Sequence, residues 1–246
     1  MSAQVPMTTR DAASAGKRVA IVQSCYVPWK GYFDLINLVD EFILYDDRQY
    51  TRRDWRNRNR IKTPQGTAWL TIPVQVKGKY LQRIDETLVN GQAWREQHWR
   101  SLQHSYAAAG HFDELGPRFL RLYESCSDDR LSMINRAFLG EVCEILGIDT
   151  RLTWSTDYAP EGDRSERLLS LCVQSGATTY LSGPSARAYL DETLFAKQGI
   201  AVEYMDYAGY PEYEQPYPPF EHAVTILDLL FCTGSAAPTH LKSFAE

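Results

Sequence analysis

Basic side chains are concentrated in residues 46–62, whose sequence is DDRQYTRRDWRNRNRIK. Six of the eleven residues in 52–62 are Lys or Arg, whereas the whole chain carries a formal net charge of −5. A guanidinium group presents a planar fork of N–H donors that matches a phosphate or a carboxylate. The segment therefore predicts an anion site, although a solvated basic face or a stripe paired with acidic residues has the same composition. We assign substrate-binding roles here to Gln49, Arg53, Arg56, Asn57 and Lys62, and a catalytic role through charge stabilisation to Arg58.

Two carboxylates, Asp46 and Asp47, open this segment where an apolar run ends. Adjacent residues of an extended chain point to opposite sides, so only one of the two is expected to face a pocket. We assign the catalytic role of a base or sugar ligand to Asp47 and a substrate-binding role to Asp46. A magnesium ligand, or an ion pair that holds the basic segment in place, is the alternative for either residue.

A second polar group is QSCYVPWKG at residues 23–31, between an apolar run and a helical pattern. Ligands of open parallel sheets bind at this kind of edge, where helix N-termini present free N–H groups. We expect Gln23, Tyr26 and Trp29 to wall a pocket and Gly31 to allow close approach of a ligand. The alternative is that the two aromatic rings only fix the helix against the sheet.

A third group is LSGPSARAY at residues 181–189, which resembles a phosphate-binding helix N-terminus without the spacing of a Walker A motif. We assign substrate binding to Ser182, Gly183 and Ser185, and simple N-capping by Ser182 is the alternative. The stretch 204–215, which holds Tyr207, Tyr210, Tyr213 and Gln215, is expected to be a packed surface loop, and a lid or pocket edge is the alternative.

The pattern of apolar residues predicts an α/β, Rossmann-like parallel sheet. Apolar runs at 18–23 and 41–45 flank a helical pattern at 31–39, which favours a parallel βαβ unit. Residues 46–65 are expected to form an extended loop before a strand at 67–76. Residues 92–146 predict three helices inserted between strands. Further strands are expected at 150–154, 178–181 and 201–205, and further helices at 165–174, 185–190 and 221–232.

Composition limits the remaining possibilities. The acidic balance, with a pI near 5.6, argues against nucleic acid as a partner. No apolar run approaches the roughly 20 residues of a membrane span. Residues 1–16 predict a disordered tail and residues 17–246 a single domain. The five cysteines form no CxxC pair and no histidine motif suits a metal, so we assign no metal and expect a cytoplasmic protein whose oligomeric state the sequence leaves open.

Four segments together are similar to the WbqC-like protein family: QSCYVPWKGYFDLI, LYDDRQYTRRDWRNRNRIK, YLSGPSARAYL and FEHAVTILDLLFCTG. The run WRNRNRIK at 55–62 is the most specific part, and the chain departs from the family pattern at Ser24, Cys25, Arg48 and Ala186. The resemblance implies a role in surface-polysaccharide or O-antigen biosynthesis. Its opening also resembles nucleotidyltransferase-type α/β folds, including the pantothenate synthetase group, although the HxGH motif of those folds is absent.

From these features we expect a transferase or ligase that acts on a nucleotide-linked sugar or amino sugar, with acyl or aminoacyl transfer as one form. The substrate would be a small anionic nucleotide sugar. The cofactor stays open, with ATP or another nucleotide as the candidate. A glycosyltransferase and a non-catalytic binding protein for an anionic glycan or nucleotide are the alternatives. We expect Arg58→Ala to weaken ligand binding by more than about tenfold, since an arginine bond to an anion contributes about 1.5–3 kcal/mol.

Overall fold

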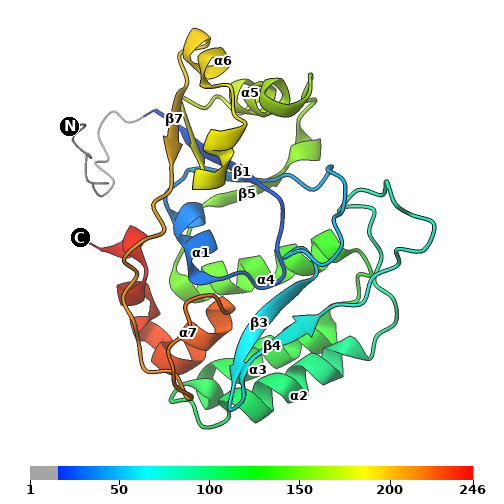
Figure 1. The fold of residues 1–246 in the computed structure, drawn as a ribbon, viewed down its shortest axis with the longest axis vertical. Coiled ribbons are helices and arrows are strands. Elements are labelled where there is room, and N and C mark those ends of the chain that lie inside the picture. The colour runs from blue at the N-terminus through cyan, green and yellow to red at the C-terminus, as the bar shows by residue number, and fades with distance from the viewer. Residues whose placement is uncertain (1–15, 246) are drawn as a thin grey trace.

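The computed structural model describes residues 16–245, so the tail predicted for residues 1–16 lies outside the described residues except for Gly16. Its centre is a five-stranded sheet in the order β5-β2-β1-β6-β7 (Figure 1). All four neighbouring strand pairs are parallel, which confirms the predicted Rossmann-like α/β class. The strands are β1 (Arg18–Val22), β2 (Glu41–Leu44), β5 (Arg151–Trp154), β6 (Thr179–Ser182) and β7 (Ala201–Tyr204).

Both faces of the sheet are covered because the side chains of its central strands alternate between two cores. Ala20 and Phe42 belong to the larger core, whereas Ile21 and Ile43 belong to the smaller one. Figure 1 shows α5 (Arg164–Gln174) and α6 (Glu192–Lys197) on one side of the sheet. On the other side lie α1 (Lys30–Asn37) and α4 (Leu131–Leu146). The central strands β1 and β2 are therefore mostly apolar, as a parallel sheet covered on both faces requires, although β2 begins with the buried Glu41.

The predicted βαβ unit is confirmed: α1 connects β1 to β2, and Val19 pairs in register with Glu41. Two later helices differ from prediction. The helix expected at 185–190 is a five-residue 3-10 helix, Pro184–Ala188. The C-terminal helix α7 is Ile226–Thr233 rather than 221–232, because the Thr225 side chain accepts the Leu227 N–H and caps it there.

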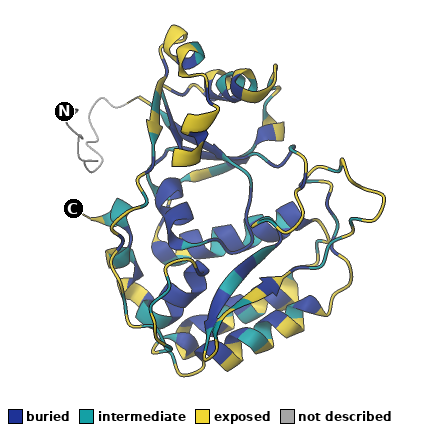
Figure 2. Ribbon diagram, viewed as in Figure 1, coloured by how far each residue is buried: buried dark blue, intermediate teal, exposed yellow. Residues whose placement is uncertain are grey.

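Three helices occupy the region predicted to be helical, namely α2 (Trp94–Tyr106), α3 (Phe112–Ser125) and α4. In α4, the residues at helical spacing are buried, as their periodicity predicts: Leu131, Ile134, Phe138 and Val142. Figure 2 shows the buried residues on the inner sides of these helices and the exposed residues on the outer turns of α2 and α3. The helices therefore enclose the larger core.

The extended loop predicted for residues 46–65 is wrong in its second half, where β3 (Arg58–Thr63) pairs antiparallel with β4 (Gly66–Thr71) in a separate two-stranded sheet. The sequence conceals this strand because two of its three buried residues, Asn59 and Lys62, are polar. Asn59 is buried and its Nδ2 donates to the Val27 carbonyl oxygen at 2.8 Å. The hairpin thereby fastens the loop after β1, where Val27 has a left-handed φ of 38°.

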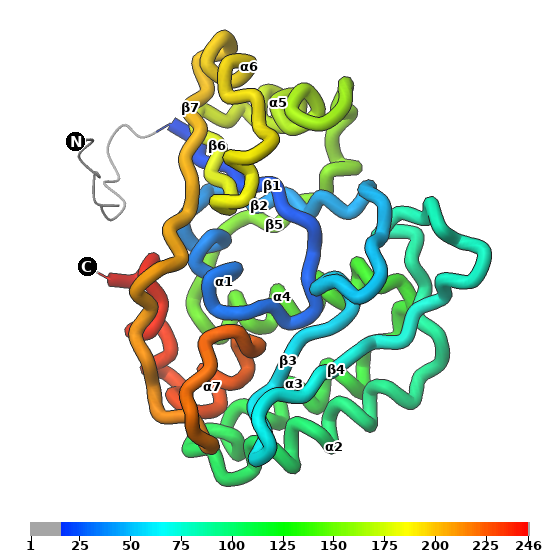
Figure 3. Tube along the Cα trace, in the orientation of Figure 1, coloured from blue at the N-terminus to red at the C-terminus, as the bar shows by residue number. Residues whose placement is uncertain are grey.

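A long segment returns from β7 to α7 along the outside of α1, as Figure 3 shows in orange. Lys30, at the start of α1, is buried and donates from Nζ to the Pro211 carbonyl oxygen at 2.9 Å. The same ammonium lies about 5 Å from the ring centres of Tyr210 and Tyr213. Within residues 16–245, no helix has both the length and the apolar character needed to cross a bilayer.

Candidate functional site

A cavity of about 600 Å³ lies at the edge of the sheet beside the ends of β1 and β6, and we call it the switch-point pocket. The strand order reverses here, because β2 lies on one side of β1 and β6 on the other. Ligands of open α/β sheets bind outside the carboxyl ends of the strands at such a point. Gln23 follows β1 and Gly183 follows β6, and both line the cavity. Its volume suits a nucleotide-sized ligand.

All the charged side chains that line the switch-point pocket are positive. Arg48, Arg56 and Arg164 line it, and its described lining includes neither aspartate nor glutamate. Arg48 shares its charge with Asp47, whose Oδ2 lies 3.3 Å from its Nη2. Because field lines concentrate in clefts with low-dielectric walls, three guanidinium groups in one cavity attract an anion even in a net acidic protein.

Arg56 fixes the loop after β1 as well as lining the pocket. Its Nη1 donates to the Gln23 carbonyl oxygen at 3.2 Å, and lies 2.9 Å from the sulfur of Cys25. Burial raises the pKa of the Cys25 thiol to about 11, against the opposing charge of Arg56. The thiol therefore stays protonated at neutral pH, and it is not a nucleophile in the resting protein.

Arg164 also lines the switch-point pocket, and its backbone has an unusual conformation. It is the first residue of α5 and has a φ of 41°, in the left-handed region that non-glycine residues rarely adopt. Asp163 before it makes no side-chain capping bond. Outliers of this kind gather at ligand sites, where the surrounding structure holds them in place. The side chain is exposed and free to meet an anion at the pocket rim.

Aromatic rings form a large part of the pocket wall. One of them, the indole of Trp29, explains why residue 31 is a glycine. Trp29 packs edge-on against Tyr207 with ring centroids 5.1 Å apart. A Cβ on Gly31 would lie 2.4 Å from the indole ring of Trp29, so this glycine makes room for the indole rather than for a ligand. Tyr207 lies in the stretch for which a packed surface loop is the prediction and a pocket edge the alternative, and it lines the pocket. The density of tyrosines there was the available signal.

The structure brings seven of the residues selected from the sequence into the lining of the switch-point pocket. They are Gln23, Trp29, Gln49, Arg56, Ser182, Gly183 and Ser185. The hydroxyl of Ser182 is engaged with the Tyr180 hydroxyl at 3.3 Å. Because the following 3-10 helix has only five residues, it offers no extended helix dipole to a phosphate. Positive charge in this pocket therefore comes from the arginines.

Other selected residues are held in the core. Tyr26 is fully buried, and its hydroxyl lies 2.6 Å from that of Tyr123 and 3.0 Å from Nδ1 of His98. Asn57 Nδ2 donates to the Ile72 carbonyl oxygen at 2.8 Å. Lys62 Nζ donates to the carbonyl oxygen of Pro219 and is buried beneath the returning segment. These three side chains join distant segments, and none of them lines the switch-point pocket.

Arg53 and Arg58 lie at the start of the hairpin rather than in the pocket. The Arg58 guanidinium stacks 4.1 Å from the ring centre of Trp69, and its Nη2 donates to the Arg53 carbonyl oxygen. Trp69 also packs against the half-exposed Trp55. Arg58 does not line the switch-point pocket, so the catalytic role that the sequence suggested for it gains no support from this geometry.

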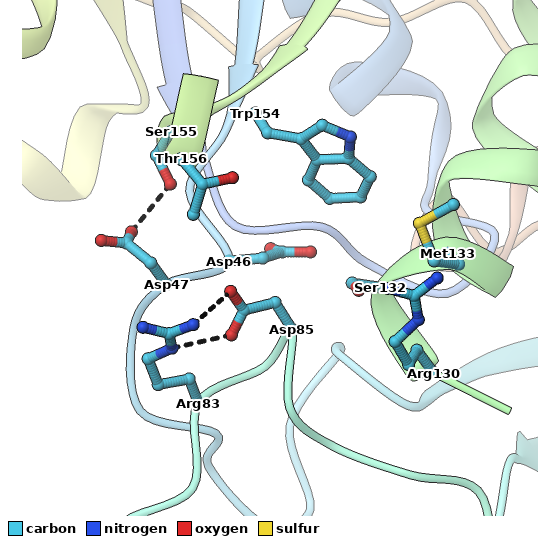
Figure 4. Close-up of a pocket in the computed structure, with 10 residues that line it drawn as sticks. All are labelled: Asp46, Asp47, Arg83, Asp85, Arg130, Ser132, Met133, Trp154, Ser155 and Thr156. Carbon is cyan, nitrogen blue, oxygen red and sulfur yellow. Dashed lines mark hydrogen bonds and ion pairs between the residues drawn. The ribbon is translucent and has the colours of Figure 1, made fainter. Parts of the chain in front are cut away.

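Asp46 and Asp47 line a second, smaller cavity of about 310 Å³ at the ends of β2 and β5, which we call the acidic pocket (Figure 4). Asp47 accepts a hydrogen bond from the Ser155 hydroxyl at 2.8 Å and pairs with Arg167. Burial alone raises the pKa of Asp47, but the bonds from Ser155 and Arg167 outweigh it and hold the pKa below its usual value. Asp47 is thus a paired, weakly basic carboxylate.

Asp46, in contrast to Asp47, lacks a hydrogen-bond partner on one oxygen within residues 16–245 and has a raised pKa. Its Oδ1 accepts the Ser24 backbone N–H at 2.7 Å, whereas its buried Oδ2 has no hydrogen-bond partner in the described structure. Burial raises the pKa of Asp46 to about 6, although the hydrogen bonding of Ser24 and the charge of Arg56 act against it. A proton acceptor near this value can work at neutral pH. Of the two carboxylates, Asp46 has the unpaired oxygen and the raised pKa that suit a base, whereas Asp47, for which the sequence suggested that role, has neither.

Residues 16–245 contain no group of three His, Cys, Asp or Glu side chains placed to hold one metal ion.

Comparison with known proteins identifies the family. The model of the WbqC-like protein family matches residues 23–240. A Mycobacterium tuberculosis (strain ATCC 25618 / H37Rv) protein described as "Uncharacterized protein Rv1507c" is 54% identical over 226 residues, which cover 92% of this chain and 98% of that protein. No solved structure matches. A match to this family suggests a role in polysaccharide or O-antigen-related biosynthesis. The chain belongs to the WbqC-like protein family.

Proposed function

We propose that this protein is a transferase or ligase acting on a nucleotide-linked sugar, which binds in the switch-point pocket with its phosphates toward Arg48, Arg56 and Arg164. One observation carries the proposal: a cavity of about 600 Å³ at the strand-order reversal combines three arginines with aromatic walls and has no carboxylate in its described lining. Group transfer in surface-polysaccharide assembly, of an acyl or aminoacyl unit, is the form of the reaction that fits the family.

The aromatic lining favours a nucleotide sugar over a smaller anion. An inorganic phosphate needs only the guanidinium groups, whereas Trp29, Tyr45 and Tyr189 add flat apolar surfaces beside them. Such surfaces stack on bases and on sugar faces. Gln23 and Gln49 add amide groups that can donate to or accept from hydroxyls. The combination matches a ligand with a charged centre and two largely apolar ends.

The side chains present also favour direct transfer between two bound molecules. The Cys25 thiol beside the pocket stays protonated, which disfavours a covalent intermediate on that residue. Preorganised arginines stabilise negative charge that develops on a phosphate or carboxylate leaving group. In this role Arg56 is well placed, because its bonds to the loop after β1 fix its orientation before a ligand arrives.

Binding is tested by titrating the protein with UDP-glucose and dTDP-glucose in a calorimeter. Arg48→Gln and Arg164→Gln are each expected to weaken binding about tenfold or more, because a charge-assisted hydrogen bond contributes about 1.5–3 kcal/mol. Arg58→Gln and Arg60→Gln make the same chemical change on the hairpin and serve as matched controls. Equal losses in the control pair and the pocket pair, or binding that survives Arg48→Gln and Arg164→Gln together, would show that the pocket does not hold the nucleotide.

Turnover is tested by incubating the protein with nucleotide sugars, with and without ATP and acyl donors. Consumption of ATP, or transfer of the acyl group to the sugar, supports the proposal. Release of free nucleoside diphosphate identifies a glycosyltransferase instead. Binding without turnover under every condition identifies a non-catalytic nucleotide or glycan receptor, and the enzymatic proposal then fails.

A further inference from the structure

The acidic pocket holds an unsatisfied buried group. Of its three lining aspartates, Asp47 is paired with Ser155 and Arg167, and Asp85 receives two bonds of 2.9 Å from Arg83. Of these three aspartates, only Asp46 has a carboxylate oxygen without a hydrogen-bond partner among the described residues. Only 1% of this residue is exposed, and its Oδ2 has no partner among the described residues.

Figure 4 shows the Asp46 carboxylate directed into the space between Asp85, Ser132 and Trp154. A buried carboxylate oxygen without a hydrogen bond costs folding free energy, since it has lost its water and gained no donor. Such groups are rare in native proteins, and a catalytic role or a bound water, ion or ligand that supplies the missing partner explains them. The position at the carboxyl ends of β2 and β5 is also the side of the sheet on which ligands of this fold class bind.

The missing partner is a hydrogen donor or a cation, and an ammonium group is both, whereas the described residues offer no group of three side chains for a metal ion. The two lining arginines already have carboxylate partners: Arg83 pairs with Asp85, and Arg130 pairs with Asp128. The lining has three aspartates against two arginines, and Arg56, whose charge acts on Asp46, lies outside this lining, so the cavity wall carries a net negative charge. A primary ammonium group carries three N–H donors and a positive charge in a small volume, and it answers both requirements.

We propose that the acidic pocket is a second ligand site, which binds a small molecule through a primary ammonium group that donates to Asp46 Oδ2. The inference rests on the proposed function in one respect, because such an amine would be the second molecule in the transfer reaction. The chain places the two sites side by side: Asp46 and Asp47 line the acidic pocket, and Arg48 and Gln49, the next two residues, line the switch-point pocket.

The test compares D-glucosamine with D-glucose, which differ by one ammonium group in place of one hydroxyl, near pH 7 by calorimetry and saturation-transfer NMR. Ethanolamine provides an arm without the sugar ring. Glucosamine is expected to bind and glucose to show no measurable binding. Asp46→Asn keeps an oxygen for the Ser24 N–H but removes the charge, and is expected to weaken glucosamine binding about tenfold or more. Ethanolamine binding that depends on Asp46 in the same way indicates that the ammonium group suffices, and its failure to bind indicates that the sugar ring contributes.

Two further variants keep the test decisive. Thr156→Trp places an indole at the exposed rim of the acidic pocket and is expected to block glucosamine without touching the core. Asp149→Asn makes the matched chemical change at an exposed position before the amino end of β5, whereas the acidic pocket lies at the carboxyl end. This variant is expected to bind glucosamine like the wild type. Glucose and glucosamine binding equally, unchanged glucosamine binding in Asp46→Asn, or no binding of either amine would overturn the inference. UDP-glucose binding measured on the same variants reports on the switch-point pocket alone, so either site can fail separately.

Discussion

Replacing Asp46 by asparagine is expected to stabilise the folded protein at neutral pH. The side chain is buried, and burial raises its pKa from the ordinary value of 3.8 to about 6. At about 1.4 kcal/mol per pKa unit, this difference means that the ionised carboxylate destabilises the fold by up to about 3 kcal/mol at pH 7. Asparagine keeps the acceptor for the Ser24 N–H and carries no charge, so most of this cost disappears.

The pH dependence follows from the direction of the pKa change. Because the folded state binds the proton more tightly than the unfolded state, the fold is favoured below the unfolded pKa of 3.8, and this contribution is lost as the pH rises through about 6. Asparagine does not titrate. Its advantage over the wild type is therefore fully present above about pH 7 and shrinks toward zero near pH 4.

Urea denaturation of both proteins at several values between about pH 4 and pH 7.5 measures this difference directly. An increase of about 2–3 kcal/mol in the free energy of unfolding corresponds to a rise of several degrees in melting temperature for a chain of this size. Asp149→Asn, which is exposed, should change neither quantity appreciably. A variant that is less stable than the wild type at neutral pH, or equally more stable at every pH, refutes the assignment of Asp46 as a buried, unsatisfied carboxylate.

Three other substitutions have distinct expected outcomes. Gly31→Ala should lower stability by about 1–3 kcal/mol and weaken UDP-glucose binding, because the new methyl group overlaps the indole of Trp29; thermal melts and calorimetry check both. Tyr26→Phe should cost about 1–2 kcal/mol of stability, since it leaves buried partners unpaired, and an altered UDP-glucose affinity would contradict its placement in the core. Arg58→Ala should leave the affinity for UDP-glucose within about twofold of wild type, because its guanidinium stacks on Trp69 outside both cavities; a loss above about tenfold would restore the role that the sequence suggested.

The parts of the fold that were predictable are those where periodicity and burial agree. The strands β1 and β2 are buried on both faces, so their apolar runs are unbroken and their ends fall close to the expected positions. The hairpin strand β3 violates this rule, because its buried side chains Asn59 and Lys62 are polar and have hydrogen-bond partners in remote segments. A pattern search along the chain has no access to such partners.

The site residues also divide into those that the sheet topology places and those that depend on remote tertiary contacts. The carboxyl ends of parallel strands lie at one edge of the sheet, so Gln23 and Ser182 could be placed at the same edge from the parallel topology alone. Tyr26 and Asp47 could not be assigned, since their roles depend on Tyr123 and Arg167, which lie about 100 residues away in the sequence. Residue types along the sequence predicted which segments bring polar side chains to the sheet edge. Tertiary contacts then determined which of these side chains remain unpaired and able to bind a ligand.

The central claim is that the switch-point pocket binds the phosphates of a nucleotide sugar, and a crystal structure grown with UDP-glucose tests it most directly. We predict density for the diphosphate within hydrogen-bonding distance of Arg48, Arg56 or Arg164, with the ligand lying between Gln23 and Ser182. A diphosphate bound instead on the hairpin beside Arg58 and Arg60, or in the acidic pocket, would contradict the account.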